Sequence, residues 1–259
     1  MLKKKFAIAS YLSWSDFMPS DKTHREVKKP QITIRYLAEY MNASDRTRRT
    51  ILRGCKYQPI ARVVQHDEAK GVVSRFVRDY ENNDFLLSEA DRIRNKLADS
   101  DFERDVNDHN ADYITRFATI SDRLHIPEAD RLAPGRAIVA SLGGTKLNIV
   151  LQFKLRRLTK TNKIRVGGGM LRYAKGKPLP AAVGEWQSAI LFGVLGLPGT
   201  ITDEAAEAEQ RLCLTIDAQS GHIYPAPTNS VSRFKNSEAA CATIADAWDQ
   251  IEPPSGAVI

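Results

Sequence analysis

The spacing of apolar residues predicts several helices. Between residues 67 and 80, one face of an α-helix is formed by Ala69, Val72, Val73, Phe76, Val77 and Tyr80. A second helix is expected over about 103–124, and a helix that is apolar on most sides, and therefore buried, over 183–195. A last amphipathic helix is expected to end near Ile251, before two prolines.

Two serines indicate further helix starts. Ser44 precedes the arginine-rich segment 45–53, which predicts a short helix. Ser88, with Asp91 three residues later, resembles a capping box that opens a helix reaching about Ala98.

From residue 147 the apolar period changes to two. The apolar set is Leu147, Ile149, Leu151, Phe153 and Leu155, which predicts one half-buried strand. The polar segment 159–162 predicts a hairpin turn, and Ile164 begins the returning strand. The glycines at 167–169 interrupt that strand and the apolar positions shift after them, which predicts a β-bulge. An earlier alternation over 32–36 predicts a short strand.

These elements indicate an α/β (α+β) protein with a mixed sheet flanked by helices. The polar stretch 81–84 lacks periodicity and is the expected boundary. We therefore expect a basic, mostly helical module over residues 1–80 and an α/β core domain with a basic hairpin over 81–259.

Composition excludes several classes of protein. The chain has 259 residues, of which 42% are hydrophobic and 27% charged, as in a globular protein. No apolar run approaches the roughly 20 residues of a membrane helix. The basic start, Met1 to Lys5, is not followed by the apolar core of a signal peptide. Three widely spaced cysteines argue against disulfides, so we expect a cytoplasmic protein.

The net charge of +7 conceals four blocks of alternating sign. They carry +10 over residues 1–78, −8 over 79–130, +12 over 131–178 and −7 over 179–259. The third block contains 12 basic residues and 0 acidic ones. Such a segment needs counter-charge, either from a ligand or from the chain's own acidic blocks.

The order of elements over residues 103–251 is a helix, about three meandering strands, a buried helix, more strand and a helix. This order resembles the restriction-endonuclease-like fold of the PD-(D/E)XK nucleases. The resemblance implies an acid early in the second strand and an acid two residues before a Lys in the third, which together hold a divalent metal ion. Here Asn148 stands at the first place, and the third strand reads Gly169-Met170-Leu171-Arg172.

The missing acids leave three readings open. Mg²⁺ is usually bound through one or two carboxylates, and residues 131–178 provide none. Either the resemblance is misleading, or the scaffold has lost its metal site, or acids reach it from outside the meander. The last reading makes Glu185 and Asp217 the catalytic candidates, with Asp112 or Asp122 as further acids.

The basic hairpin is the strongest functional signal. Lys154 and Arg156 alternate on one predicted face, and Lys163, Arg165 and Arg172 are expected to extend it on the returning strand. Residues two apart on a strand are separated by about 6.7 Å, roughly twice the axial spacing of phosphates along one nucleic-acid strand. Such a face could contact alternate phosphates.

The predicted nucleic-acid contacts combine the hairpin with the arginine-rich helix. They are Arg46, Arg48, Arg49, Arg53, Lys154, Arg156, Arg157, Lys160, Lys163, Arg165, Arg172 and Lys175, with Lys177 nearby. Because no aromatic residues interleave with the hairpin charges as stacking platforms, phosphate contact is expected and base-specific reading is not.

Other candidate chemistry has an ordinary structural explanation. The glycine runs match no phosphate-binding loop, and no His or Cys spacing fits zinc, so no cofactor is expected. His66 with Asp67 fits a capped helix start. Cys55, beside Arg53 and Lys56, is the one thiol whose pKa we expect to be lowered.

Three functional hypotheses follow. The first is a nucleic-acid-binding protein, with DNA as the expected partner, whose nuclease-like core is inactive and acts as a subunit of a larger complex. The second is a metal-dependent nuclease using Mg²⁺ with acids from outside the hairpin. The third is an interaction module for an acidic protein partner.

Overall fold

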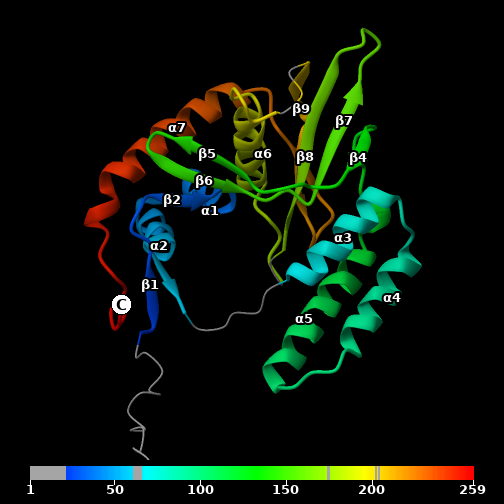
Figure 1. Cartoon of the computed structure of the whole chain (residues 1–259), viewed down its shortest axis with the longest axis horizontal. Coiled ribbons are helices and arrows are strands. Elements are labelled where there is room, and N and C mark those ends of the chain that lie inside the picture. The colour runs from blue at the N-terminus through cyan, green and yellow to red at the C-terminus, as the bar shows by residue number, and fades with distance from the viewer. Residues whose placement is uncertain (1–21, 61–65, 174–175, 202, 204) are drawn as a thin grey trace, which may run out of the picture.

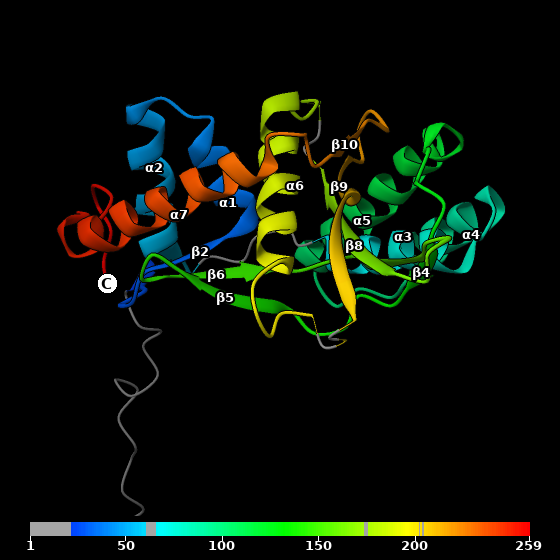
Figure 2. The same cartoon turned by 90° about the horizontal axis from the view of Figure 1, so that it is seen from above.

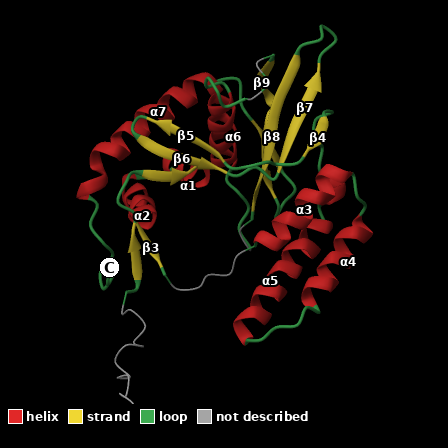
Figure 3. Cartoon of the chain, in the orientation of Figure 1, coloured by secondary structure: helices red, strands yellow, loops and turns green. Residues whose placement is uncertain are grey.

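The computed structural model describes residues 22–60, 66–173, 176–201, 203 and 205–259. The helices are α1 (Ile34–Met41), α2 (Asp45–Lys56), α3 (Asp67–Asp79), α4 (Asn83–Arg94), α5 (Asp101–Ala118), α6 (Ala181–Leu195) and α7 (Ser230–Ala247). The strands are β1 (His24–Glu26), β2 (Gln31–Thr33), β3 (Tyr57–Pro59), β4 (Asp130–Leu132), β5 (Ile138–Leu142), β6 (Thr145–Ile149), β7 (Phe153–Leu158), β8 (Ile164–Arg172), β9 (Ala206–Asp217) and β10 (Ile223–Pro225). The α/β class expected from the sequence is confirmed (Figures 1 and 3).

The main sheet has five strands in the order β10-β9-β8-β7-β4. Strands β8 and β9 are parallel and are joined through α6, and every other neighbouring pair is antiparallel. One face contributes Met170 and Cys213 to a core shared with α6, and the other contributes Phe153 and Leu214 to a core shared with α3, α4 and α5. The strands at the centre of this sheet are therefore buried on both faces.

A second sheet, in the order β2-β6-β5, joins the N-terminal segment to the middle of the chain. Strand β2 lies parallel to β6, with Ile32 opposite Leu147. The strand expected over 32–36 is confirmed only at its start, because Thr33 accepts a hydrogen bond from Tyr36 N and α1 begins at Ile34. Residues on both sides of position 80 contribute to each buried cluster.

The single strand expected over 147–155 is two strands in different sheets. Strand β6 ends at Ile149 and β7 begins at Phe153, while Val150 between them is 61% exposed. The backbone N–H of Gln152 donates to Gly169 O, its side-chain oxygen accepts from Leu171 N, and its carbonyl accepts from Ser74. The apolar alternation continues through the break because Ile149, Leu151 and Phe153 are all buried, so periodicity alone could not reveal it.

The hairpin turn expected at 159–162 is confirmed, whereas the bulge lies on a different strand. Strands β7 and β8 pair without a break from Leu158 and Ile164 to Phe153 and Gly169. Between β8 and β9, Val166 pairs with Ala208 but Gly168 pairs with Cys213, so β9 contains the extra residues. The apolar positions of β8 shift because both of its faces are buried, which requires no extra residue in that strand.

Local caps define the helix starts, with one correction. Ser44 caps α2 by accepting from Thr47 N, as predicted. Helix α4 begins earlier than predicted, at Asn83, where Asn82 accepts from Phe85 N at 3.1 Å. Ser88 lies inside that helix and donates to Phe85 O instead.

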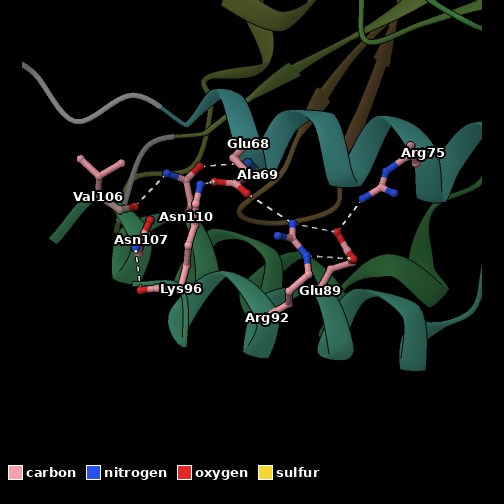
Figure 4. Close-up of polar contacts among 9 residues, drawn as sticks. All are labelled: Glu68, Ala69, Arg75, Glu89, Arg92, Lys96, Val106, Asn107 and Asn110. Atoms are coloured by element: carbon pink, nitrogen blue, oxygen red, sulfur yellow. Dashed lines mark hydrogen bonds and ion pairs between the residues drawn. The ribbon is translucent and has the colours of Figure 1, made fainter. Parts of the chain in front are cut away.

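Polar side chains connect helices α3, α4 and α5 (Figure 4). Glu89 on α4 pairs with Arg75 on α3 at 2.5 Å and with Arg92 at 3.2 Å, and Arg92 reaches Glu68 at 3.3 Å. Asn110 on α5 accepts the backbone N–H of Ala69 at 2.9 Å and so caps the start of α3. The three helices therefore share hydrogen bonds as well as an apolar core.

Residues after α7 form hydrogen bonds with the N-terminal part of the molecule. Lys56, 4% exposed, donates to Trp248 O at 2.9 Å and to Asp249 O and Ile251 O at 3.3 Å each. The indole of Trp248 donates to Val27 O at 3.0 Å. Among the described residues, no helix has the length and apolar character needed to cross a bilayer.

Candidate functional site

The hairpin cations predicted to share one face lie on two. Arg157 is directly opposite Arg165, and opposite residues of an antiparallel pair point to the same side. Lys154 and Arg156 alternate with Arg157 and therefore lie on the other face. The predicted single basic face is wrong because the register of the turn places the two strands one step out of the expected alignment.

Three hairpin arginines have acidic partners within the chain. Arg157 pairs with Glu209 at 2.5 Å, Arg165 pairs with Glu207, and Arg156 lies 3.8 Å from Asp130. The acids come from the neighbouring strands β9 and β4, so part of the counter-charge is internal. No ion pair of Lys154, Lys160 or Lys163 occurs among the described residues, and all three side chains are exposed.

Arg172 is not part of the hairpin surface. It is 9% exposed, donates to Gln187 Oε1 at 2.7 Å and pairs with Glu39 on α1. Burial and then the nearby charge of Arg35 lower the pKa of Arg172, and Glu39 opposes that shift. The prediction that Arg172 points outward is wrong, because it assumed that one face of β8 is exposed, whereas both faces are buried at this end of the strand. Lys175 lies outside the described residues.

The arginines of α2 do not extend the hairpin surface. Helix α2 and the β7–β8 hairpin lie on different sides of the molecule in both views (Figures 1 and 2). Arg46 and Arg49 are exposed, Arg48 lies 3.3 Å from Asp45, and Arg53 donates to the carbonyl of Glu252.

A charged pocket of about 300 Å³ lies where β8 and β9 end. Three cations, Arg35, Arg172 and Lys177, line it together with Glu39 and Asp217. Helix α1 supplies Arg35 and Glu39, which are 3.5 Å apart at helical i, i+4 spacing. This pair was not expected from the sequence, because the alternation over 32–36 predicts a strand whereas α1 begins at Ile34. Ligands commonly bind at the carboxyl ends of parallel strands, which makes this the candidate site.

Asp217, one of the two catalytic candidates, lies in this pocket but has its oxygens occupied. It is fully buried, and Oδ1 accepts from Gln219 N at 2.9 Å. Oδ2 accepts from Leu179 N at 3.0 Å and from Ser220 Oγ at 2.7 Å. The carboxylate therefore supports the loops around the pocket.

The other candidate acids lie elsewhere and also have partners. Glu185 pairs with Arg233 at 2.8 Å, Asp112 pairs with Arg94 at 2.9 Å, and Asp122 accepts from Asn83. Within the described part of the chain, no three His, Cys, Asp or Glu side chains form a group suited to a metal ion. These residues do not fit the magnesium site of the second hypothesis.

Cys55 also differs from the expectation. Its side chain is buried, and burial, with a smaller contribution from Glu39, raises the pKa of the thiol to about 12. The adjacent cations of the sequence do not lower the pKa, because Arg53 is directed to the C-terminal segment and Lys56 to the carbonyls around Trp248.

Comparison with known proteins assigns no family to the chain. Neither a protein-family model nor a curated protein matches the sequence.

Proposed function

We propose that the chain binds nucleic acid through its phosphates and that its core is a nuclease-like scaffold that does not cleave. The order of elements supports this proposal. Helix α5 is followed by β4, β7 and β8 of one sheet, then by α6 and by β9 parallel to β8, with β5 and β6 inserted after β4.

One observation carries the proposal, namely the cation-lined pocket at the ends of β8 and β9. Arg172 stands at the end of β8, where the resembling nucleases have a Lys, and Met170 stands two residues earlier, where they have an acid. The cation is retained and the carboxylate is absent. Arg35, Arg172 and Lys177 exceed Glu39 and Asp217 by one charge, so the pocket can attract a phosphate, but neither Asp217 nor Glu39 is available to hold a metal ion.

The hairpin adds a second, weaker set of contacts. It extends beyond the rest of the sheet (Figure 1), and it carries the exposed Lys154, Lys160 and Lys163. Arg156 and Arg165 contribute less, because a phosphate would compete with Asp130 and Glu207 for them.

Binding to a labelled DNA duplex, measured by fluorescence anisotropy at several salt concentrations, tests the proposal. We expect the double variant Arg35→Gln/Lys177→Gln to bind all sequences more weakly, with a salt slope reduced by roughly 0.9 per lost phosphate contact. The triple variant Lys154→Gln/Lys160→Gln/Lys163→Gln should show a smaller loss. Lys235→Gln, an exposed change on α7, is the matched control.

Two results would contradict the proposal. Unchanged affinity in both multiple variants would exclude these surfaces as the binding site. Cleavage of the duplex with Mg²⁺ that disappears in Asp217→Asn would show that the core is an active nuclease.

A further inference from the structure

A second, larger cleft lies along the free edge of the main sheet. It has a volume of about 780 Å³ and lies beside the edge strand β4, between the end of α3 and the outer half of β7. Its lining includes Tyr80, Arg131, Arg156 and Arg157. This cleft is separate from the pocket at the ends of β8 and β9, with which it shares no residue.

Tyr80 occupies a backbone position that usually carries glycine. It ends α3 in the left-handed conformation, with φ of 57°, and its N–H donates to Phe76 O. Glycine is the common residue at such a helix end because it has no Cβ. The residue is also 65% exposed, so burial of the ring does not account for a tyrosine at this position. The local fold alone would favour glycine.

Arg131 holds the tyrosine ring in place. Its guanidinium lies 4.1 Å from the centre of the Tyr80 ring, and its Nη1 donates to Val77 O at 2.9 Å. The Tyr80 hydroxyl donates to Ala129 O at 3.4 Å. The ring is thus fixed from one side by Arg131 and presents the rest of its surface to solvent, as a stacking platform does.

Positive charge lies beside this platform. Arg156 and Arg157 line the same cleft, and the Nε atoms of Arg131 and Arg157 are buried without a hydrogen-bond partner. Glu128 and Asp130 also line the cleft. Arg156 lies 3.8 Å from Asp130 and Arg157 pairs with Glu209, whereas Arg131 has no ion pair in the described part of the chain. An aromatic ring next to arginines suits a flat base joined to a phosphate.

We propose that this cleft binds an unpaired base of single-stranded nucleic acid, with Tyr80 stacking on the base and Arg156 contacting the adjoining phosphate. This inference rests on the proposed function and specifies it, because the faces of bases in a duplex are covered by their neighbours and only an unpaired base can stack on Tyr80.

Binding of a labelled single strand and of its duplex to Tyr80→Gly and Tyr80→Phe tests the proposal. Tyr80→Gly removes the ring and suits the left-handed backbone, so the fold is retained and thermal denaturation will verify this. We expect it to weaken single-strand binding on the order of tenfold and to leave duplex binding unchanged. Tyr80→Phe keeps the ring and the same backbone conformation, and should bind the single strand as the wild type does.

The outcomes separate this proposal from the proposed function. If the wild type binds duplex and single strand, and Tyr80→Gly retains full single-strand affinity, only the cleft proposal fails. An equal loss for strand and duplex also overturns it. A nucleoside monophosphate that competes as well as the single strand would mean that the site takes free nucleotides. If the wild type binds neither strand nor duplex, both proposals fail.

Discussion

At the scale of single residues, the middle of β8 is glycine because its neighbours approach too closely for a side chain. A Cβ at Gly169 would lie 2.0 Å from the ring of Phe153, its partner across the strand pair. By contrast, a Cβ at Gly71 on α3 would meet nothing within 4 Å. Two glycines of one chain are therefore expected to respond to the same substitution with opposite sign.

We predict that Gly169→Ala lowers the free energy of unfolding by about 1–3 kcal/mol, because the added methyl forces Phe153 from its place. Gly71→Ala should raise it by about 0.5–1 kcal/mol, because alanine favours the helix. Urea denaturation of both variants measures the two effects. A Gly169→Ala protein as stable as the wild type would mean that Phe153 can move without loss.

The environments of single side chains could not all be predicted from the sequence. The three consecutive glycines were recognised as a special feature, but the close contact with Phe153 is not visible from spacing. Cys55 has cationic neighbours in the sequence, yet burial governs its thiol. The chemistry of a side chain depends on its neighbours in space, and many of these neighbours are distant in the sequence.

At the scale of elements, the helices α3, α4 and α5 depend on the ionised form of Glu89. Burial acts to raise the pKa of Glu89, but the hydrogen bonds and charges of Arg92 and Arg75 outweigh it and lower that pKa below its ordinary value of 4.5. A carboxyl group with a lowered pKa stabilises the fold above its unfolded-state pKa. That contribution is lost as the pH falls through the folded-state value.

We therefore predict that Glu89→Gln lowers the melting temperature at pH 7 and that its difference from the wild type shrinks steadily as the pH falls below about 4.5. Thermal denaturation across this pH range measures the difference. Glu81→Gln, an exposed change just after α3, is the control and should differ little from the wild type at any pH. A constant difference between the wild type and Glu89→Gln would rule out the ionisation as its cause.

Elements with local signals were predicted well. The apolar stripe over 67–80 corresponds to α3, at Asp67–Asp79, because one face of that helix is buried. The division between β6 and β7 was missed because the apolar residues Ile149, Leu151 and Phe153 recur at every second position across the break, as they would in one strand. The period of apolar residues indicates which side chains are buried, but it does not indicate to which sheet a strand belongs.

At the scale of the whole molecule, Lys56 joins the N-terminal segment to the residues after α7. Its ammonium group is buried and donates to three carbonyls, those of Trp248, Asp249 and Ile251. Without Lys56, Trp248 O keeps the backbone N–H of Ile251 and Ile251 O keeps the Tyr57 hydroxyl, but all three carbonyls lose a charged donor in a buried place. The loss should therefore exceed that of an ordinary surface contact.

We predict that Lys56→Met lowers the free energy of unfolding by about 2–4 kcal/mol. Lys146→Met, on the exposed side of β6, should change it by less than about 0.5 kcal/mol. Chemical denaturation with intrinsic Trp fluorescence measures both variants. Equal stability of the two would mean that methionine packing replaces the three hydrogen bonds.

The candidate site shows the same limit at this scale. The sequence identified the cations of the hairpin and the absence of acids, but their partners come from far along the chain. Glu39, which pairs with Arg172, is 133 residues away. Glu207 and Glu209 reach the hairpin only because β9 lies parallel to β8. Which charges remain available to a ligand therefore depends on the tertiary fold.

The contact between Lys56 and Trp248 also sets an order of events during translation. A ribosome makes the N-terminal segment first, whereas its partner Trp248 follows 192 residues later. At about 5–20 residues per second, the nascent segment waits roughly 10–40 s for that partner. Helices α3 to α5 can associate with one another in the meantime, so Lys56 reaches its final contacts only after helices that follow it in the sequence have formed.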